Sequence, residues 1–147
     1  MKRILSLDGG GIRGIIPATI LAYIEKRTGK TISRMFDLIA GTSSGGVLAM
    51  ALSIGGAKGK PLYSAERLIE LYEKRGGDIF SRTLWKEVSS VAGIIDQRYS
   101  HEPLEKVYNQ YFKKTRLSAS LTKVLVSTYD IENRRPYFFK SWKTDTG

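Results

Sequence analysis

Short apolar runs and glycine-rich breaks follow one another through the first sixty residues in an order that predicts alternating strands and helices. Residues 3–8 alternate apolar and polar side chains, as a β-strand does, before glycines interrupt the pattern at 9–11. Pro17 suits the first turn of a helix, and Gly29 suits its end. The expected elements are a strand over 3–8, an amphipathic helix from 17 to about 28, a strand over 36–40 and a buried helix over about 44–54.

The second half of the chain is predicted to add helices and then a hairpin. Ser64 is placed to cap a helix that runs to about Arg75, where glycines 76 and 77 would end it. Further expected elements are a loop over 55–61, a short helix over 84–91, a helix over 100–112 and strands over 123–129 and 136–142 around a polar turn. This order predicts an α/β fold, a three-layer α/β/α domain with a largely parallel sheet and a C-terminal β-hairpin.

The most specific chemical signal is the G-x-S-x-G motif of Gly41, Ser43 and Gly45, which stands between an apolar strand and helix-forming residues. This layout is typical of a nucleophile elbow, in which a serine occupies a sharp, strained turn between strand and helix. The glycines leave room where the two elements meet, and the Ser43 hydroxyl would project beside the helix N-terminus. An ordinary glycine-rich turn has the same letters, so the order strand, motif, helix carries the prediction of a catalytic Ser43.

A second glycine motif, Gly9-x-Gly11-x-x-Gly14, follows the first predicted strand. It matches the dinucleotide-binding fingerprint, which makes a Rossmann domain one alternative. A Rossmann site also needs an acid at the end of the second strand, whereas Asp37 stands at the start of that strand. The other interpretation is an oxyanion hole, in which bare glycine N–H groups hold the negative oxygen of an acyl intermediate.

The glycine turn and Ser43 both follow the carboxyl ends of predicted strands, so they are expected to face one cleft. Arg13 lies within the turn. Its side chain either adds positive charge to the cleft or pins the loop through backbone hydrogen bonds, and the residues leave both interpretations open.

Asp-Gly-Gly-Gly-Ile-Arg-Gly at 8–14, followed by Gly-Thr-Ser-Ser-Gly-Gly at 41–46, resembles the patatin-like phospholipases. The resemblance covers the chain from residue 3 onward, strongly to about residue 53. It implies a serine lipid acyl hydrolase for phospholipids, lysophospholipids or related esters, with a Ser-Asp dyad and neither metal nor organic cofactor. By this resemblance Ser43 is the nucleophile, the amides of Gly9, Gly10 and Gly11 form the oxyanion hole with Arg13 in support, and Gly14, Gly41 and Gly45 complete the motifs.

The base that would activate Ser43 is harder to find. His101, the single histidine, begins a predicted helix, where capping or exposure is the simpler interpretation. The family's aspartate belongs to an Asp-Gly-Gly or Asp-Gly-Ala motif, and no Asp-Gly follows Ser43. Asp130 falls in the hairpin turn, where aspartate typically caps its own backbone. Asp78 and Asp96 have no such motif around them, and Asp145-Thr146-Gly147 is the nearest string but has the wrong spacing.

The expectation is therefore that residues 1–147 are the N-terminal part of a single patatin-like domain. The dyad aspartate would lie beyond Gly147, and this chain would be inactive alone. A second hypothesis is a non-catalytic homologue that binds a lipid surface or a partner.

Charge and composition limit the kinds of partner that this chain is expected to bind. The 24 Lys and Arg residues exceed the 14 Asp and Glu residues, for a net charge of +10. This excess favours contact with an anionic membrane, while no basic run is interleaved with aromatic residues as nucleic-acid binding would require. The absence of cysteine excludes disulfides and fits a cytoplasmic protein, which the basic charge would bring into peripheral contact with membranes. Open sheet edges in an incomplete domain would favour a homo-oligomer.

Overall fold

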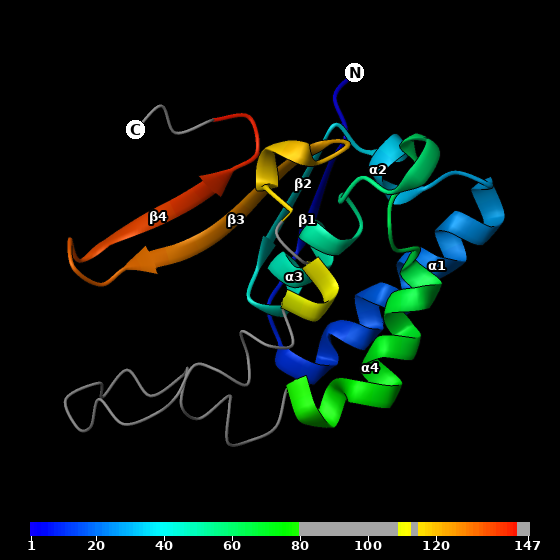
Figure 1. The fold of residues 1–147 in the computed structure, drawn as a ribbon, viewed down its shortest axis with the longest axis horizontal. Coiled ribbons are helices and arrows are strands. Elements are labelled where there is room, and N and C mark those ends of the chain that lie inside the picture. The colour runs from blue at the N-terminus through cyan, green and yellow to red at the C-terminus, as the bar shows by residue number, and fades with distance from the viewer. Residues whose placement is uncertain (80–108, 113–114, 144–147) are drawn as a thin grey trace.

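A four-stranded sheet carries the fold in the computed structural model, which describes residues 1–79, 109–112 and 115–143 (Figure 1). The strands stand side by side in the order of the chain. They are β1 (Ile4–Leu7), β2 (Leu38–Thr42), β3 (Lys123–Asp130) and β4 (Arg135–Lys140). The first three are parallel, and β4 returns antiparallel to β3 as the second strand of a hairpin.

The register brings the carboxyl ends of the parallel strands to one edge of the sheet. Leu7 at the end of β1 is level with Gly41 of β2, which is level with Val126 of β3. The residues that leave β1 and β2 therefore enter the same region of space, as ligand-binding loops do in open α/β sheets.

Helices cover one face of this sheet in the described part of the chain. They are α1 (Ile15–Thr28), the short α2 (Ile32–Met35), α3 (Ser44–Ala51) and α4 (Ala65–Ile79). Single 3₁₀ turns occupy Gly11–Gly14, Ala57–Gly59 and Leu117–Ala119. Helix α3 lies across β1, β2 and β3, and α1 packs beside α4 (Figure 1).

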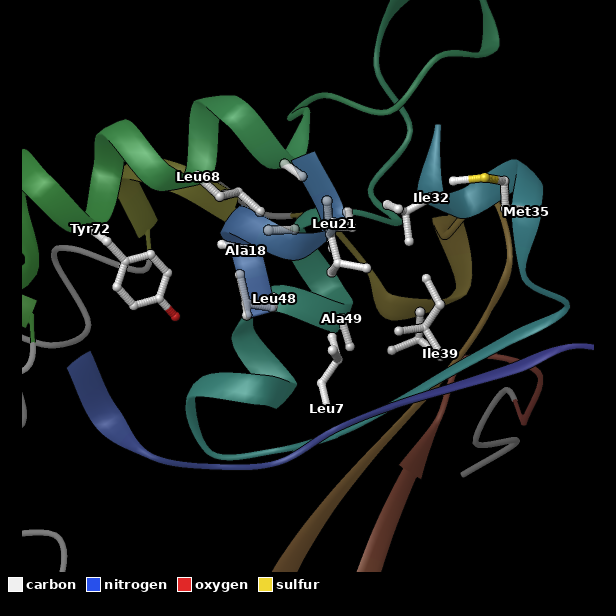
Figure 2. Packing of buried hydrophobic residues seen from close by; sticks show 14 residues of the cluster. Leu7, Ala18, Leu21, Ile32, Met35, Ile39, Leu48, Ala49, Leu68 and Tyr72 are labelled. Atoms are coloured by element: carbon white, nitrogen blue, oxygen red, sulfur yellow. The ribbon is translucent and has the colours of Figure 1, made fainter. Parts of the chain in front are cut away.

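The core forms where the inward side of the strands meets these helices. Leu7 and Ile39 of the sheet point toward Leu48 of α3, with Leu21 of α1 and Leu68 of α4 packed behind them (Figure 2). Ile39 and Leu48 are 0% and 1% exposed. Each buried aliphatic side chain of this kind stabilises the fold by about 1.5–3 kcal/mol. The core thus holds α3 rigidly against the sheet.

The α/β class, the largely parallel sheet and the C-terminal hairpin are confirmed. The described helices lie on one face, so the second helical layer stays an expectation. The helix that ends at Gly29 is confirmed, because Gly29 adopts φ 64° and its N–H donates to the Glu25 carbonyl at 2.8 Å.

Several element boundaries differ from the prediction. Strand β2 begins at Leu38, two residues late, and α3 ends at Ala51. Helix α4 does not stop at glycines 76 and 77, since a glycine costs a helix interior only about 1 kcal/mol. Helix α2 has no sequence signal of its own. The helix predicted over 84–91 lies outside the described residues, and of the one predicted over 100–112 only 109–112 is described, as helix.

Glu25 near the end of α1 ties three helices together. One carboxylate oxygen accepts the N–H of Ile32, the first residue of α2, at 3.0 Å. The other accepts the N–H of Ala65, the first residue of α4, at 2.8 Å. Both donors belong to residues that are 0% exposed. A carboxylate is favourable at a helix N-terminus, where unpaired N–H groups carry partial positive charge.

Replacing Glu25 should therefore destabilise the fold. We expect Glu25→Ala to lower the free energy of unfolding by about 1–3 kcal/mol, because two buried N–H groups lose their acceptor. Denaturant unfolding measures the change. The matched control Glu73→Ala removes an exposed carboxylate from α4 and should stay within about 0.5 kcal/mol of the parent. Equal losses in the two variants would contradict the role of Glu25.

Candidate active site

Ser43 occupies a strained turn between β2 and α3. It adopts φ 54° and ψ −123°, one of three non-glycine residues with positive φ in the described part of the chain. Its side chain is exposed, whereas the next residue, Ser44, is buried. Such a conformation costs of order 1–3 kcal/mol and persists only where its surroundings impose it. The elbow geometry predicted from the G-x-S-x-G motif is therefore present.

The two glycines of the motif permit a direct contact between backbones. A Cβ placed on Gly41 would lie 2.3 Å from the Gly45 carbonyl oxygen, where α3 begins. A Cβ placed on Gly45 would lie 2.1 Å from the carbonyl oxygen of Leu7, at the end of β1. No side chain fits at either position, since backbone atoms cannot rotate away. The first turn of α3 is thereby wedged between the ends of β1 and β2.

The glycine turn after β1 lies directly against this elbow. A Cβ on Gly9 would come within 3.0 Å of the Ser43 Cβ and of the Thr42 carbonyl oxygen. Gly11 adopts φ 58°, a conformation that favours glycine. A Cβ on Gly14 would overlap the phenol ring of Tyr72 on α4, 2.3 Å from its oxygen. The structure thus brings both predicted motifs together at the carboxyl edge of the sheet.

The peptide groups of Gly10 are held from both sides. The Gly10 N–H donates to the Ser44 hydroxyl oxygen at 3.1 Å. The Gly10 carbonyl accepts the backbone N–H of Arg13 at 3.1 Å and the Arg13 Nε–H at 3.5 Å. Of the two interpretations left open for Arg13, these bonds favour the one in which it pins the loop. Sequence reasoning missed Ser44, although a hydroxyl in a helix start made of glycine and apolar residues is the signal that could have revealed it.

Two further features surround the turn. A hollow of about 340 Å³ lies beside it, and its lining includes the polar Asp8 and Arg13, Gly9, and the apolar Ile16 and Ile20. Next to Ser43, the hydroxyls of Thr42 and Ser127 form a 2.6 Å hydrogen bond that joins the end of β2 to the middle of β3.

Of the aspartates considered as bases, one has a described side chain. Asp130 caps its own hairpin turn: its carboxylate accepts the Asn133 backbone N–H at 3.1 Å and the Asn133 amide at 2.8 Å. These hydrogen bonds hold the pKa of Asp130 below its usual value. The expected capping role is confirmed. Asp78 has no described side chain, and Asp96, His101 and Asp145 lie outside the described residues.

Asp37 lies at the opposite edge of the sheet. Its carboxylate accepts the backbone N–H of Arg3 at 2.8 Å and pairs with the Lys2 ammonium at 3.3 Å. The Arg3 hydrogen bond lowers the pKa of this exposed carboxyl. Because Asp37 stands at the amino ends of β1 and β2, it cannot hold a ribose at the glycine turn. This position argues against the Rossmann alternative.

Other classes of site were sought within residues 1–79, 109–112 and 115–143. No cluster of three His, Asp or Glu side chains there could hold a metal ion. Among the same residues, every helix is too short or too polar to cross a membrane.

An exposed, strained serine against a glycine turn, at the carboxyl edge of a parallel sheet, defines an α/β protein with a nucleophile-elbow architecture. The sequence profile of the patatin family, described as patatin-like phospholipase, matches residues 5–146. The chain belongs to the patatin-like phospholipase family.

Individual relatives agree with this assignment. Patatin-like protein 2 of Oryza sativa is 37% identical over 153 residues, covering 97% of this chain and 38% of the rice protein. Patatin-like protein 4 of Arabidopsis thaliana is 35% identical, over 95% of this chain and 36% of its own length. Patatin-17 of Solanum cardiophyllum is 33% identical with the same coverage. The chain thus spans little more than a third of the length of these curated relatives.

The backbone contact at Gly45 predicts a sharp response to a single methyl group. We expect Gly45→Ala to lower the free energy of unfolding by at least about 1–3 kcal/mol, because its Cβ would collide with the Leu7 carbonyl. Gly55→Ala is the control, since a Cβ there would meet its nearest atom at 3.5 Å. Thermal unfolding of both variants measures the difference. A Gly45→Ala protein as stable as Gly55→Ala would contradict the contact.

The positive φ of Ser43 makes a second prediction about stability. Ser43→Gly should be more stable than Ser43→Ala by about 1 kcal/mol, because glycine adopts this conformation without strain. The same pair of substitutions at Ser118, in the 3₁₀ turn Leu117–Ala119, should show the opposite order, since glycine is the poorer helix former. Denaturant midpoints of the four variants test the sign at each site.

Proposed function

We propose that this chain carries the nucleophile-bearing part of a serine lipid acyl hydrolase, of the phospholipase A or lysophospholipase type. The observation that supports it most directly is the strained, exposed Ser43 beside the glycine turn. Family membership supports the general class, a hydrolase of lipid acyl esters. The proposed substrate is a phospholipid or another acyl-ester lipid.

In the proposed reaction, the Ser43 hydroxyl oxygen attacks the acyl carbonyl carbon while its proton passes to a base. The carbonyl electrons move onto oxygen and form a tetrahedral oxyanion. When this intermediate collapses, the bond to the alcohol breaks and the alcohol takes the proton, which leaves an acyl ester on Ser43. Water then attacks this ester by the same route, releases the fatty acid and restores the serine.

The proposed oxyanion hole is the turn of Gly9, Gly10 and Gly11, in which the backbone amides that do not already donate within the protein bind the oxyanion. The position of Gly9 against Ser43 supports this assignment, because donors must lie near the atom that the nucleophile attacks. Arg13 supports the turn through the Gly10 carbonyl. Gly14, which packs against Tyr72, and the motif glycines Gly41 and Gly45 shape the backbone rather than contact substrate.

The proposed base is an aspartate outside residues 1–147, which completes a Ser-Asp dyad. Asp130 and Asp37 are both engaged in local hydrogen bonds, and Asp37 stands at the far edge of the sheet. The matched relatives are more than twice as long as this chain, so they contain residues without a counterpart here. The proposed mechanism needs no metal or organic cofactor, because serine, amides and a carboxylate supply every step.

The functional assignment predicts that one hydroxyl carries the activity. In the full-length gene product, Ser43→Ala should lower kcat for a short-chain p-nitrophenyl ester by at least about 10³-fold, since no other group replaces the nucleophile. A fluorophosphonate probe should label the parent protein and not the variant. Ser118→Ala, another exposed serine, is the matched control and should leave both readouts unchanged.

The alternative, a non-catalytic homologue that binds a lipid surface or a partner, has its own signature. Full hydrolysis by Ser43→Ala would mean that Ser43 is not the nucleophile. A full-length protein that neither hydrolyses the ester nor reacts with the fluorophosphonate would favour the binding module.

A further inference from the structure

We infer that Ser44, the residue that follows the candidate nucleophile, is a positioning residue that holds the glycine turn in register with Ser43. This inference rests on the proposed function for its kinetic consequence. The contact on which it stands is independent of that function. The Ser44 hydroxyl oxygen accepts the Gly10 N–H at 3.1 Å across 34 positions of sequence.

The burial of Ser44 protects its hydrogen bond to Gly10 from water. Ser44 is 1% exposed, so water cannot readily replace the serine oxygen as the acceptor for Gly10. Gly10 itself is half-buried, so its N–H is partly shielded from water and its loss of an acceptor carries a cost that favours a single position of the turn. The loop would otherwise have unusual freedom, because residues 9–11 are all glycine.

Because of where Ser44 lies, its hydrogen bond to Gly10 affects the position of the glycine turn relative to Ser43. Ser44 is the first residue of α3, directly after the strained Ser43, and that turn is wedged against β1 through Gly45. Its side chain is therefore held on the same rigid segment as the nucleophile. On the far side of the turn, Arg13 binds the Gly10 carbonyl. The distance between the glycine amides and the Ser43 hydroxyl thus depends on Ser44 from one side and on Arg13 from the other.

The Ser44–Gly10 hydrogen bond also gives the Gly10 amide a different role from the amides of Gly9 and Gly11. While Ser44 accepts the Gly10 N–H, that group is directed at the serine oxygen. The neighbouring amides of Gly9 and Gly11 remain as donors for an oxyanion. Loss of the Ser44 hydroxyl should consequently slow catalysis, because the glycine turn would be misplaced. A faster rate would instead mean that the Ser44 hydroxyl keeps the Gly10 N–H from donating to the oxyanion.

The experiment removes this hydroxyl from the full-length protein. Ser44→Ala should lower kcat for a p-nitrophenyl ester by about 10–100-fold with KM nearly unchanged, as expected when a donor group is displaced from the transition state. The affinity for a trifluoromethyl ketone, which forms a tetrahedral adduct with serine, should fall by a similar factor. Ser44→Thr keeps the hydroxyl oxygen and should restore most of kcat.

Ser53→Ala is the matched control. Ser53 is 0% exposed and follows the same helix, but its hydroxyl has no hydrogen-bond partner in the described part of the chain. Its loss removes a buried hydroxyl without touching the glycine turn, so kcat should stay within about twofold of the parent. If Ser44→Ala does not fold, Ser44→Cys, which keeps the size but weakens the acceptor, takes its place with the same expectation.

Amide hydrogen exchange provides a readout that does not depend on activity. Exchange at Gly10 should be at least about tenfold faster in Ser44→Ala than in the parent and unchanged in Ser53→Ala. Unchanged Gly10 exchange, an unchanged or higher kcat in Ser44→Ala, or an equal loss in Ser53→Ala would overturn the inference. If Ser43 proves not to be a nucleophile, the exchange experiment still decides whether Ser44 holds the turn.

Discussion

The structure depends on one close contact between backbones, where the end of β2 and the end of β1 both touch the first turn of α3. Gly41 and Gly45 are the points of contact, and a Cβ at either would lie within 2.3 Å of a carbonyl oxygen. Because the chain must turn at once from strand into helix there, Ser43 has no room to adopt an ordinary conformation. The same contact determines where α3 begins, which residue is strained, and how near the glycine turn after β1 can approach.

A strained serine survives at this place because its neighbours on both sides are held firmly. On the apolar side, Leu48 and Ile39 pack α3 onto the sheet and contribute more than the order of 1–3 kcal/mol that the strained turn costs. On the polar side, Ser44 holds Gly10 through its hydroxyl. The hydrophobic contacts supply the stability, and the directional hydrogen bond supplies the position. The proposed role of Ser43 as a nucleophile requires both, because a shift of about 1 Å can cost two orders of magnitude in rate.

Family membership and geometry address different parts of the functional question. Membership in the patatin-like phospholipase family places the chain among proteins named for lipid hydrolysis. The geometry of the site concerns the candidate nucleophile Ser43 and the glycine turn beside it. Among the described aspartates, Asp37 and Asp130 already have carboxylates engaged in local hydrogen bonds. The proposed dyad takes its serine from Ser43, and the chain spans 38% of the rice relative.

The sequence by itself determined the local features: the strand–elbow–helix order, the glycine C-cap at Gly29 and the cap formed by Asp130 follow from residue types at short spacing. The two motifs also sufficed to predict the family, which the family profile confirms over residues 5–146. Only the tertiary structure decided that helix α2 exists, that Glu25 joins three helices and that Ser44 holds Gly10. Those features depend on contacts between residues far apart in the chain, and local pattern carries no information about which distant groups will meet.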